Sequence, residues 1–199
     1  MEKRALERVV GAPGRGRSGR RPDWGGEGIG RRAGLGQATG AFLAEIETEP
    51  GGAGEPAPAL LARLQDRGLD ESAISNMLAL VAEQQQATGV LPTDLRLVVE
   101  RCRDELGDWR LMLHSPYGRR VRDPWALAVA ARLREQAGID PAVVASDDGI
   151  IVRIPDRSGR PPGAEVFLFD PDGVRQIIRR SIAGAALFAA RFRECASRA

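Results

Sequence analysis

The stretch Leu91–Ser115 reads LPTDLRLVVERCRDELGDWRLMLHS, and it decides the fold class. Its two runs, Leu95–Cys102 and Trp109–His114, show the alternating side chains of strands that have one well-buried face. A short acidic connection containing Gly107 joins them, which predicts a hairpin. On the first strand, we expect the buried face to carry Leu95, Leu97 and Val99.

Further hairpin and helix signals follow this stretch. Asp123-Pro124 is a typical helix start, with an acceptor at the cap and proline at the first position, and predicts a buried helix over Trp125–Gln136. Two strands, Ala142–Ser146 and Ile150–Ile154, flank the turn formers Asp147-Asp148-Gly149. Asp147 and Asp148 could also serve as metal ligands, but turn formation is the favoured interpretation.

The C-terminal part predicts one more strand and two helices. The strand is expected over Glu165–Phe169, and the helices over Asp172–Ser181 and Gly184–Ala199. The last helix has no terminating signal, so we expect the domain to be truncated at its C-terminus.

The residues before the first hairpin are expected to be helical. Apolar spacing predicts helices over Ala33–Glu47, Ala59–Arg67 and Glu71–Ala87, with Asp70 as an N-cap and Gly89 just past the last helix. The buried stripe of the third helix comprises Ile74, Met77, Leu78 and Val81.

These patterns together predict an α+β protein. A mixed or antiparallel β-sheet built on hairpins, with flanking helices, is expected in a domain over residues 91–199. Before it we expect a helical segment over residues 33–90, with a linker at residues 50–58, and a Gly/Arg-rich loop or arm over residues 1–32.

The charge is distributed unevenly along the chain. The net charge is +2, but residues 1–32 carry nine basic against four acidic residues, and residues 174–199 carry six against one. Basic ends on an acidic body favour contact with a phosphate backbone, although solvated arginines are also common in a chain with 28 arginines and one lysine.

The Gly/Arg-rich segment leaves two interpretations open. Gly14, Gly16 and Gly19 spell GxGxxG, but Pro22 follows at once and no helical pattern opens, so a dinucleotide fingerprint is rejected. Trp24 stands among six arginines, an arrangement that suits base stacking with phosphate contacts. The alternative is a loosely packed loop.

Several classes of protein are disfavoured. The sequence has no Walker A motif, GxSxG elbow, HExxH motif or cysteine–histidine metal spacing, and we expect no catalytic or metal-binding residues. Cys102 and Cys195 are expected to be free thiols, and His114 a strand-end side chain. No apolar run is long enough to span a membrane and no signal-peptide core is present, so a cytoplasmic location is expected.

A resemblance to a known family extends this reading. The runs QQQATGVLPTD, LVVERCRDELGDW, LHSPYGRRV, PWALAVAARLRE and SDDGIIVRIPD resemble the large helicase-related (Lhr) family of superfamily 2 helicases. The similar region of that family is the DEAD/H-associated region, downstream of the motor and winged-helix domains. The earlier segment around Pro22-Asp23-Trp24 resembles the same region's proline–glycine loop, although the family usually has an aromatic residue where this chain has Asp23.

The resemblance implies a nucleic-acid-binding accessory region of an ATP-dependent 3′-to-5′ DNA helicase. Such a region would help to guide the tracking single strand during unwinding and repair, on single-stranded DNA or RNA–DNA hybrid. ATP and magnesium belong to the family's motor domains, so no cofactor is expected in this chain and no ATPase activity from it alone. The expected contacts are stacking by Trp24, phosphate binding by Arg20, Arg21, Arg31 and Arg32, and further contacts from Tyr117, Arg119 and Arg120.

Two other functions stay open from the sequence. The region is alternatively a structural docking partner of the helicase motor, in which case apolar surface is left exposed in the isolated chain. A non-functional gene fragment is the third interpretation, suggested by the abrupt C-terminus and by first ten residues that do not resemble the family.

Overall fold

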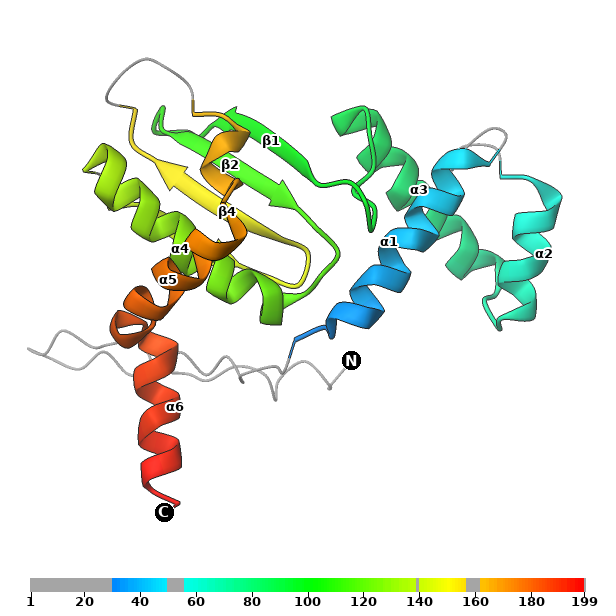
Figure 1. Ribbon diagram of the computed structural model, residues 1–199. Coiled ribbons are helices and arrows are strands. Elements are labelled where there is room, and N and C mark those ends of the chain that lie inside the picture. The colour runs from blue at the N-terminus through cyan, green and yellow to red at the C-terminus, as the bar shows by residue number, and fades with distance from the viewer. Residues whose placement is uncertain (1–29, 50–55, 139, 157–161, 199) are drawn as a thin grey trace, which may run out of the picture.

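The computed structural model describes residues 30–49, 56–138, 140–156 and 162–198 (Figure 1). Within them lie six α-helices and a four-stranded antiparallel sheet, which confirms the predicted α+β class. The predicted arm residues Arg20, Arg21 and Trp24 lie outside the described residues. None of the described helices has the length and apolar character needed to cross a membrane.

Three helices form the first packed unit: α1 (Ala33–Thr48), α2 (Pro58–Asp66) and α3 (Glu71–Thr88). The predicted end signals of α3 are confirmed, because the Asp70 carboxylate accepts the Ala73 N–H at 2.7 Å and Gly89 is left-handed with φ of 77°. The buried cluster that joins the helices comprises Ile46, Leu60, Leu64, Ile74, Leu78, Val81 and Leu91.

The sheet contains β1 (Val98–Arg103), β2 (Trp109–His114), β3 (Ala142–Ala145) and β4 (Gly149–Ile154), in the order β1-β2-β4-β3. Both predicted hairpins are present. The first is closed by the Asp104 carboxylate, which accepts the N–H groups of Leu106 and Asp108, and by Gly107 at φ of 83°.

The first strand begins later than predicted. Leu95 and Leu97 are 94% and 44% exposed, and pairing with β2 starts only at Val98. The reason is a local turn before the strand, in which the Thr93 N–H donates to the Arg96 carbonyl and the Thr93 hydroxyl accepts the Leu95 N–H. The predicted burial of Leu95 and Leu97 is therefore wrong, while Val99 does pack against the core.

Helix α4 (Arg119–Ala137) covers one face of the sheet (Figure 1). It begins before the predicted Asp123-Pro124 start, and Pro124 lies inside the helix. The first turn is instead capped from another element, because Asp147 Oδ1 accepts the Arg119 N–H at 3.0 Å. The core between α4 and the sheet comprises Leu111, Leu113, Val129, Leu133, Ile150, Val152, Ile154, Val166 and Phe167.

The predicted strand at Glu165–Phe169 is wrong, because a 3₁₀ turn, η1 (Ala164–Phe167), occupies this segment. Side chains of α4 donate hydrogen bonds to the carbonyl groups of this turn. Trp125 Nε1 donates to the Phe167 carbonyl at 3.0 Å, and Arg132 donates to the Glu165 carbonyl at 2.8 Å. Buried apolar side chains alone do not distinguish such a segment from a strand.

Two helices follow η1. Helix α5 (Pro171–Ser181) starts at Asp170, whose carboxylate accepts the N–H groups of Asp172 and Gly173. A 3₁₀ turn, η2 (Ile182–Gly184), connects it to α6 (Ala186–Ala196), which extends away from the sheet (Figure 1). Phe188 and Phe192 of α6 are 41% and 64% exposed.

The helical unit meets the sheet unit through backbone contacts. A Cβ at Gly36 would overlap the Pro116 carbonyl oxygen, whereas a Cβ at Gly34, on the exposed side of the same helix, would meet nothing within 4 Å. The fit of α1 against the loop after β2 therefore depends on the missing side chain at residue 36.

This contact generates a matched pair of stability predictions. Gly36→Ala should lower the free energy of unfolding by about 1–3 kcal/mol, because α1 must move away from the loop. Gly34→Ala should raise it by up to about 1 kcal/mol through helix propensity. Urea unfolding followed by circular dichroism measures both, and equal effects of the two variants would contradict close packing at residue 36.

Candidate nucleic-acid interface

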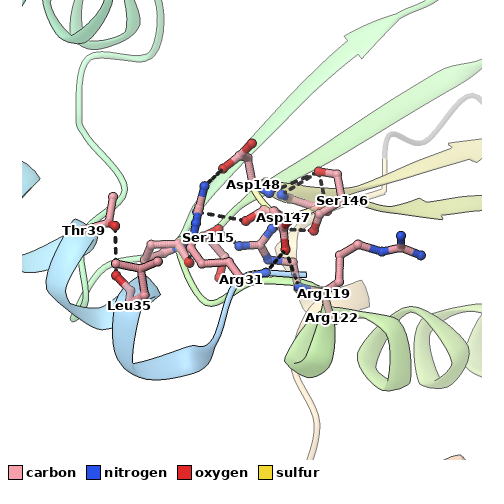
Figure 2. Close-up of polar contacts among 11 residues, drawn as sticks. Arg31, Leu35, Thr39, Ser115, Arg119, Arg122, Ser146, Asp147 and Asp148 are labelled. Carbon is pink, nitrogen blue, oxygen red and sulfur yellow. Dashed lines mark hydrogen bonds and ion pairs between the residues drawn. The ribbon is translucent and has the colours of Figure 1, made fainter. Parts of the chain in front are cut away.

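Three segments that are distant in the sequence meet at one corner of the molecule (Figure 2). They are the segment just before α1 at Arg31, the loop Ser115–Gly118 after β2, and the β3–β4 turn at Asp147 and Asp148. Sequence analysis names Arg31, Tyr117, Arg119 and Arg120 as candidate contacts, and the structure brings the segments that carry them together.

Arg31 holds the corner with both its backbone and its side chain. Its N–H donates to Asp147 Oδ1 at 2.8 Å. Its guanidinium donates to the carbonyl oxygens of Pro116 and Asp147 at 3.2 and 3.1 Å, and pairs with Asp148 Oδ1 at 2.9 Å. We call this set of contacts the Arg31 clasp (Figure 2).

The Asp147 carboxylate is shared between two backbone segments. One oxygen, Oδ1, accepts both the Arg31 N–H at 2.8 Å and the Arg119 N–H at 3.0 Å. These two hydrogen bonds hold the pKa of Asp147 below its ordinary value of 3.8, because they stabilise the ionised form. Asp147 thus connects the segment just before α1 to the first residue of α4.

Arg122 lies buried beneath the clasp. Its guanidinium donates to the Ser146 carbonyl at 2.7 Å and to the Ser115 carbonyl, so it joins the loop after β2 to the β3–β4 turn. Burial lowers the pKa of Arg122 to about 10, which leaves the side chain charged at neutral pH. The corner therefore contains a fixed internal positive charge.

The loop after β2 is anchored by Tyr117 and Gly118. The Tyr117 hydroxyl donates to the Asp94 carbonyl at 2.5 Å. Gly118 has φ of 74°, and a Cβ there would overlap the Arg31 carbonyl oxygen. Glycine is required on both counts, since a side chain would strain the backbone and displace Arg31.

The predicted contact residues occupy different positions at this corner. Arg31 and Tyr117 make the internal contacts described above, and the Arg119 side chain lies 3.5 Å from Asp123. Arg32 and Arg120 follow Arg31 and Arg119 directly in the sequence, and both are exposed. Whether any of these side chains contacts a nucleic acid stays a prediction.

The acidic residues of the first hairpin form contacts with other side chains of the sheet. Asp104 and Asp108 pair with Arg153 at 2.7 and 2.8 Å, and His114 Nε2 lies 3.0 Å from Glu100 Oε2. Among the residues that the structure describes, no group of three or more histidine, cysteine, aspartate or glutamate side chains is placed to hold a metal ion.

Sequence reasoning missed the roles of Asp147 and Arg122. Asp147 reads as an ordinary turn former, and Arg122 is one of many arginines in SPYGRRVR. No local pattern distinguishes an arginine that will be buried from one that is solvated. The burial of Arg122 is determined by tertiary contacts, since its partners are carbonyl groups from two separate loops.

A model of the DEAD/H associated family matches residues 91–199, which is more than half of the chain. The chain belongs to the DEAD/H associated family. This match confirms the predicted resemblance to the DEAD/H-associated region of Lhr-type helicases, together with the relatives described next.

The relatives are Lhr helicases. The chain is 50% identical over 193 residues to the Lhr helicase/uracil glycosylase of Escherichia coli strain K12, and 51% identical over 193 residues to the Lhr helicase/probable uracil glycosylase of Mycolicibacterium smegmatis. Each match covers 97% of this chain, which spans 12% of the length of either relative.

A solved structure agrees with the fold. The Mycobacterium smegmatis helicase Lhr bound to ssDNA and AMP-PNP is similar with a TM-score of 0.78 and 51% sequence identity. The similarity covers 92% of this chain and 22% of that protein. The region described here is thus similar in both sequence and fold to part of a DNA-bound helicase.

The clasp generates a prediction about stability and pH. Asp147→Ala should destabilise the fold more than Asp148→Ala, because Asp147 serves two backbone N–H groups whereas the Asp148 side chain is 80% exposed. Because the pKa of Asp147 is lowered on folding, its contribution is present above about pH 4 and is lost as the pH falls further.

Urea unfolding of both variants at pH 7 and at pH 3 measures this difference. The wild type should lose more stability between these two pH values than Asp147→Ala does. Equal pH dependence of the wild type and Asp147→Ala would contradict the assigned role.

Proposed function

We propose that this chain is a nucleic-acid-binding accessory region of an Lhr-type ATP-dependent 3′-to-5′ DNA helicase. The observation that carries the proposal is the 51% identity, across 92% of the chain, to a helicase Lhr bound to ssDNA. In this proposal the region helps to guide the tracking single strand during unwinding and repair. Its substrates are single-stranded DNA or an RNA–DNA hybrid.

The Arg31 clasp supports the proposal through what it anchors. Arg31 and Arg119 share one oxygen of Asp147, so the exposed Arg32 and Arg120 extend from neighbouring points of the backbone. Guanidinium groups are well suited to phosphate, because they present several donors in a fixed geometry. Further arginines and Trp24 precede the clasp in the sequence.

In this proposal the chemistry of ATP hydrolysis belongs elsewhere. ATP and magnesium are bound by the motor domains of the helicase, which act together with this region either in one chain or as a separate chain. The proposal includes the cytoplasmic location that is expected from the sequence.

The central test is binding of fluorescently labelled single-stranded DNA across a range of salt concentrations. Affinity should fall as salt rises, with a logarithmic slope of about 0.7 for each phosphate contact. An absence of binding at low salt would overturn the proposal.

Trp24 gives the sharpest variant for this assay. Trp24→Ala should weaken single-strand binding by about 1–3 kcal/mol, because stacking on a base is lost. Trp24→Phe is the matched control and should retain most of the affinity, since it keeps an aromatic face. Equal affinity of Trp24→Ala and wild type at every salt concentration would remove Trp24 from the interface.

An apolar groove favours a second candidate function, docking of this region against the helicase motor. The groove, of about 420 Å³, lies between α4, α5 and the segment before β1, and its rim includes Leu97 and Leu168, which are 44% and 67% exposed. Exposed apolar surface of this kind is typical of a protein interaction site. Its remaining lining includes Val121, Phe169, Val174 and Ile178.

Docking is tested by co-purification with a separately expressed motor fragment of the same helicase. Leu168→Asp should reduce the amount of motor recovered several-fold, because it places a charge in the apolar contact. Leu106→Asp, at the tip of the first hairpin, is the matched control, because Leu106 is also highly exposed (78%), and it should leave recovery unchanged. Recovery that is insensitive to Leu168→Asp would exclude this groove as the docking site.

A further inference from the structure

A separate cavity of about 420 Å³ lies where α1, α3 and the loop after β2 meet. Leu43 and Leu80 contribute apolar walls from the two helices, and Pro116 contributes one from the loop. Gln84, His114 and Ser115 add polar groups. We propose that this cavity binds one unstacked nucleobase of a single strand, an inference that rests on the function proposed above.

The shape and lining of the cavity suit a base. A nucleobase has two apolar faces and a polar edge, so it needs apolar walls together with a few hydrogen-bonding groups. The cavity provides mostly apolar lining, and Leu80 at its mouth is 67% exposed although it is a large aliphatic residue. A base inserted beside Leu80 would cover this side chain.

One polar group of the cavity has unsatisfied hydrogen-bonding capacity. Ser115 is 2% exposed, and its hydroxyl has no hydrogen-bond partner in the described part of the chain. A buried hydroxyl without a partner costs free energy, which a ligand that supplies a partner recovers. The side-chain amide of Gln84, half-buried on α3, is a second polar group in the lining of the cavity.

The amide of Gln84 is the group best suited to read a base. It presents a donor and an acceptor side by side, the arrangement that glutamine uses to pair with the edge of adenine. His114 is a less adaptable neighbour, because Nε2 is held 3.0 Å from Glu100. We therefore assign base discrimination to Gln84.

The position of the cavity links it to the Arg31 clasp. Arg31 lines the cavity and also belongs to the clasp, from which Arg32 and Arg120 extend. In the proposal, the phosphates of a strand pass these arginines while a neighbouring base enters the cavity beside Arg31. This arrangement would let the accessory region grip a strand by backbone and base together.

The experiment uses the 199-residue chain and single-stranded oligonucleotides that carry the fluorescent base 2-aminopurine at successive positions. Binding to wild type should raise the fluorescence strongly at one position, because the base there leaves the stack. Gln84→Trp, which fills the cavity, should abolish this position-specific signal.

A second measurement tests the reading of the base. With each natural base placed at the responsive position, wild type should prefer one base by about fivefold or more in affinity. Gln84→Leu should remove this preference, whereas the matched control Gln86→Leu, exposed on the same helix and outside the cavity lining, should keep it.

The outcomes separate the two proposals. Strand binding without any position-specific fluorescence overturns the base site and leaves the proposed function standing. A signal or preference that persists in Gln84→Trp or Gln84→Leu also overturns the assignment. An absence of single-strand binding overturns the proposed function and the base site together.

Discussion

One shared carboxylate oxygen organises this molecule. Asp147 Oδ1 accepts the N–H groups of Arg31 and Arg119, and thereby joins the β3–β4 turn to the starts of two helices. The Arg31 guanidinium and the buried Arg122 then bind the carbonyl oxygens of the adjoining loops. The helical unit and the sheet unit have separate apolar cores. These polar contacts and the close approach of α1 to the loop after β2 therefore hold the two units in position against each other.

The proposed nucleic-acid functions depend on the relative position of these two units. The arginines expected to bind phosphate extend from the clasp, and the proposed base cavity is bounded by α1 and α3 on one side and by the loop after β2 on the other. If α1 shifted, the cavity and the clasp would change together. The apolar groove lies between α4, α5 and the segment before β1, so the proposed docking and the proposed strand contact use different surfaces.

Local patterns predicted most of the fold, because the signals for the hairpins and for the ends of α3 are contained within a few residues. The turn at Gly107 and the cap at Asp70 are examples. Errors arose where a distant residue replaced a local signal. The start of α4 is set by Asp147, and the carbonyl groups of η1 accept hydrogen bonds from the side chains of Trp125 and Arg132 instead of from a neighbouring strand. For the same reason the sequence indicated candidate arginines, but it did not indicate that Arg31 and Arg122 bind within the fold.

The remote cap at Asp147 also bears on how the chain folds. The first turn of α4 completes its hydrogen bonding only when the β3–β4 hairpin has formed, although the two are separated by 28 residues. The contact between Arg31 and Asp147 closes a longer loop, since 116 residues separate the two. We therefore expect slow amide exchange at Arg119 to report the opening of the hairpin and not the fraying of its own helix.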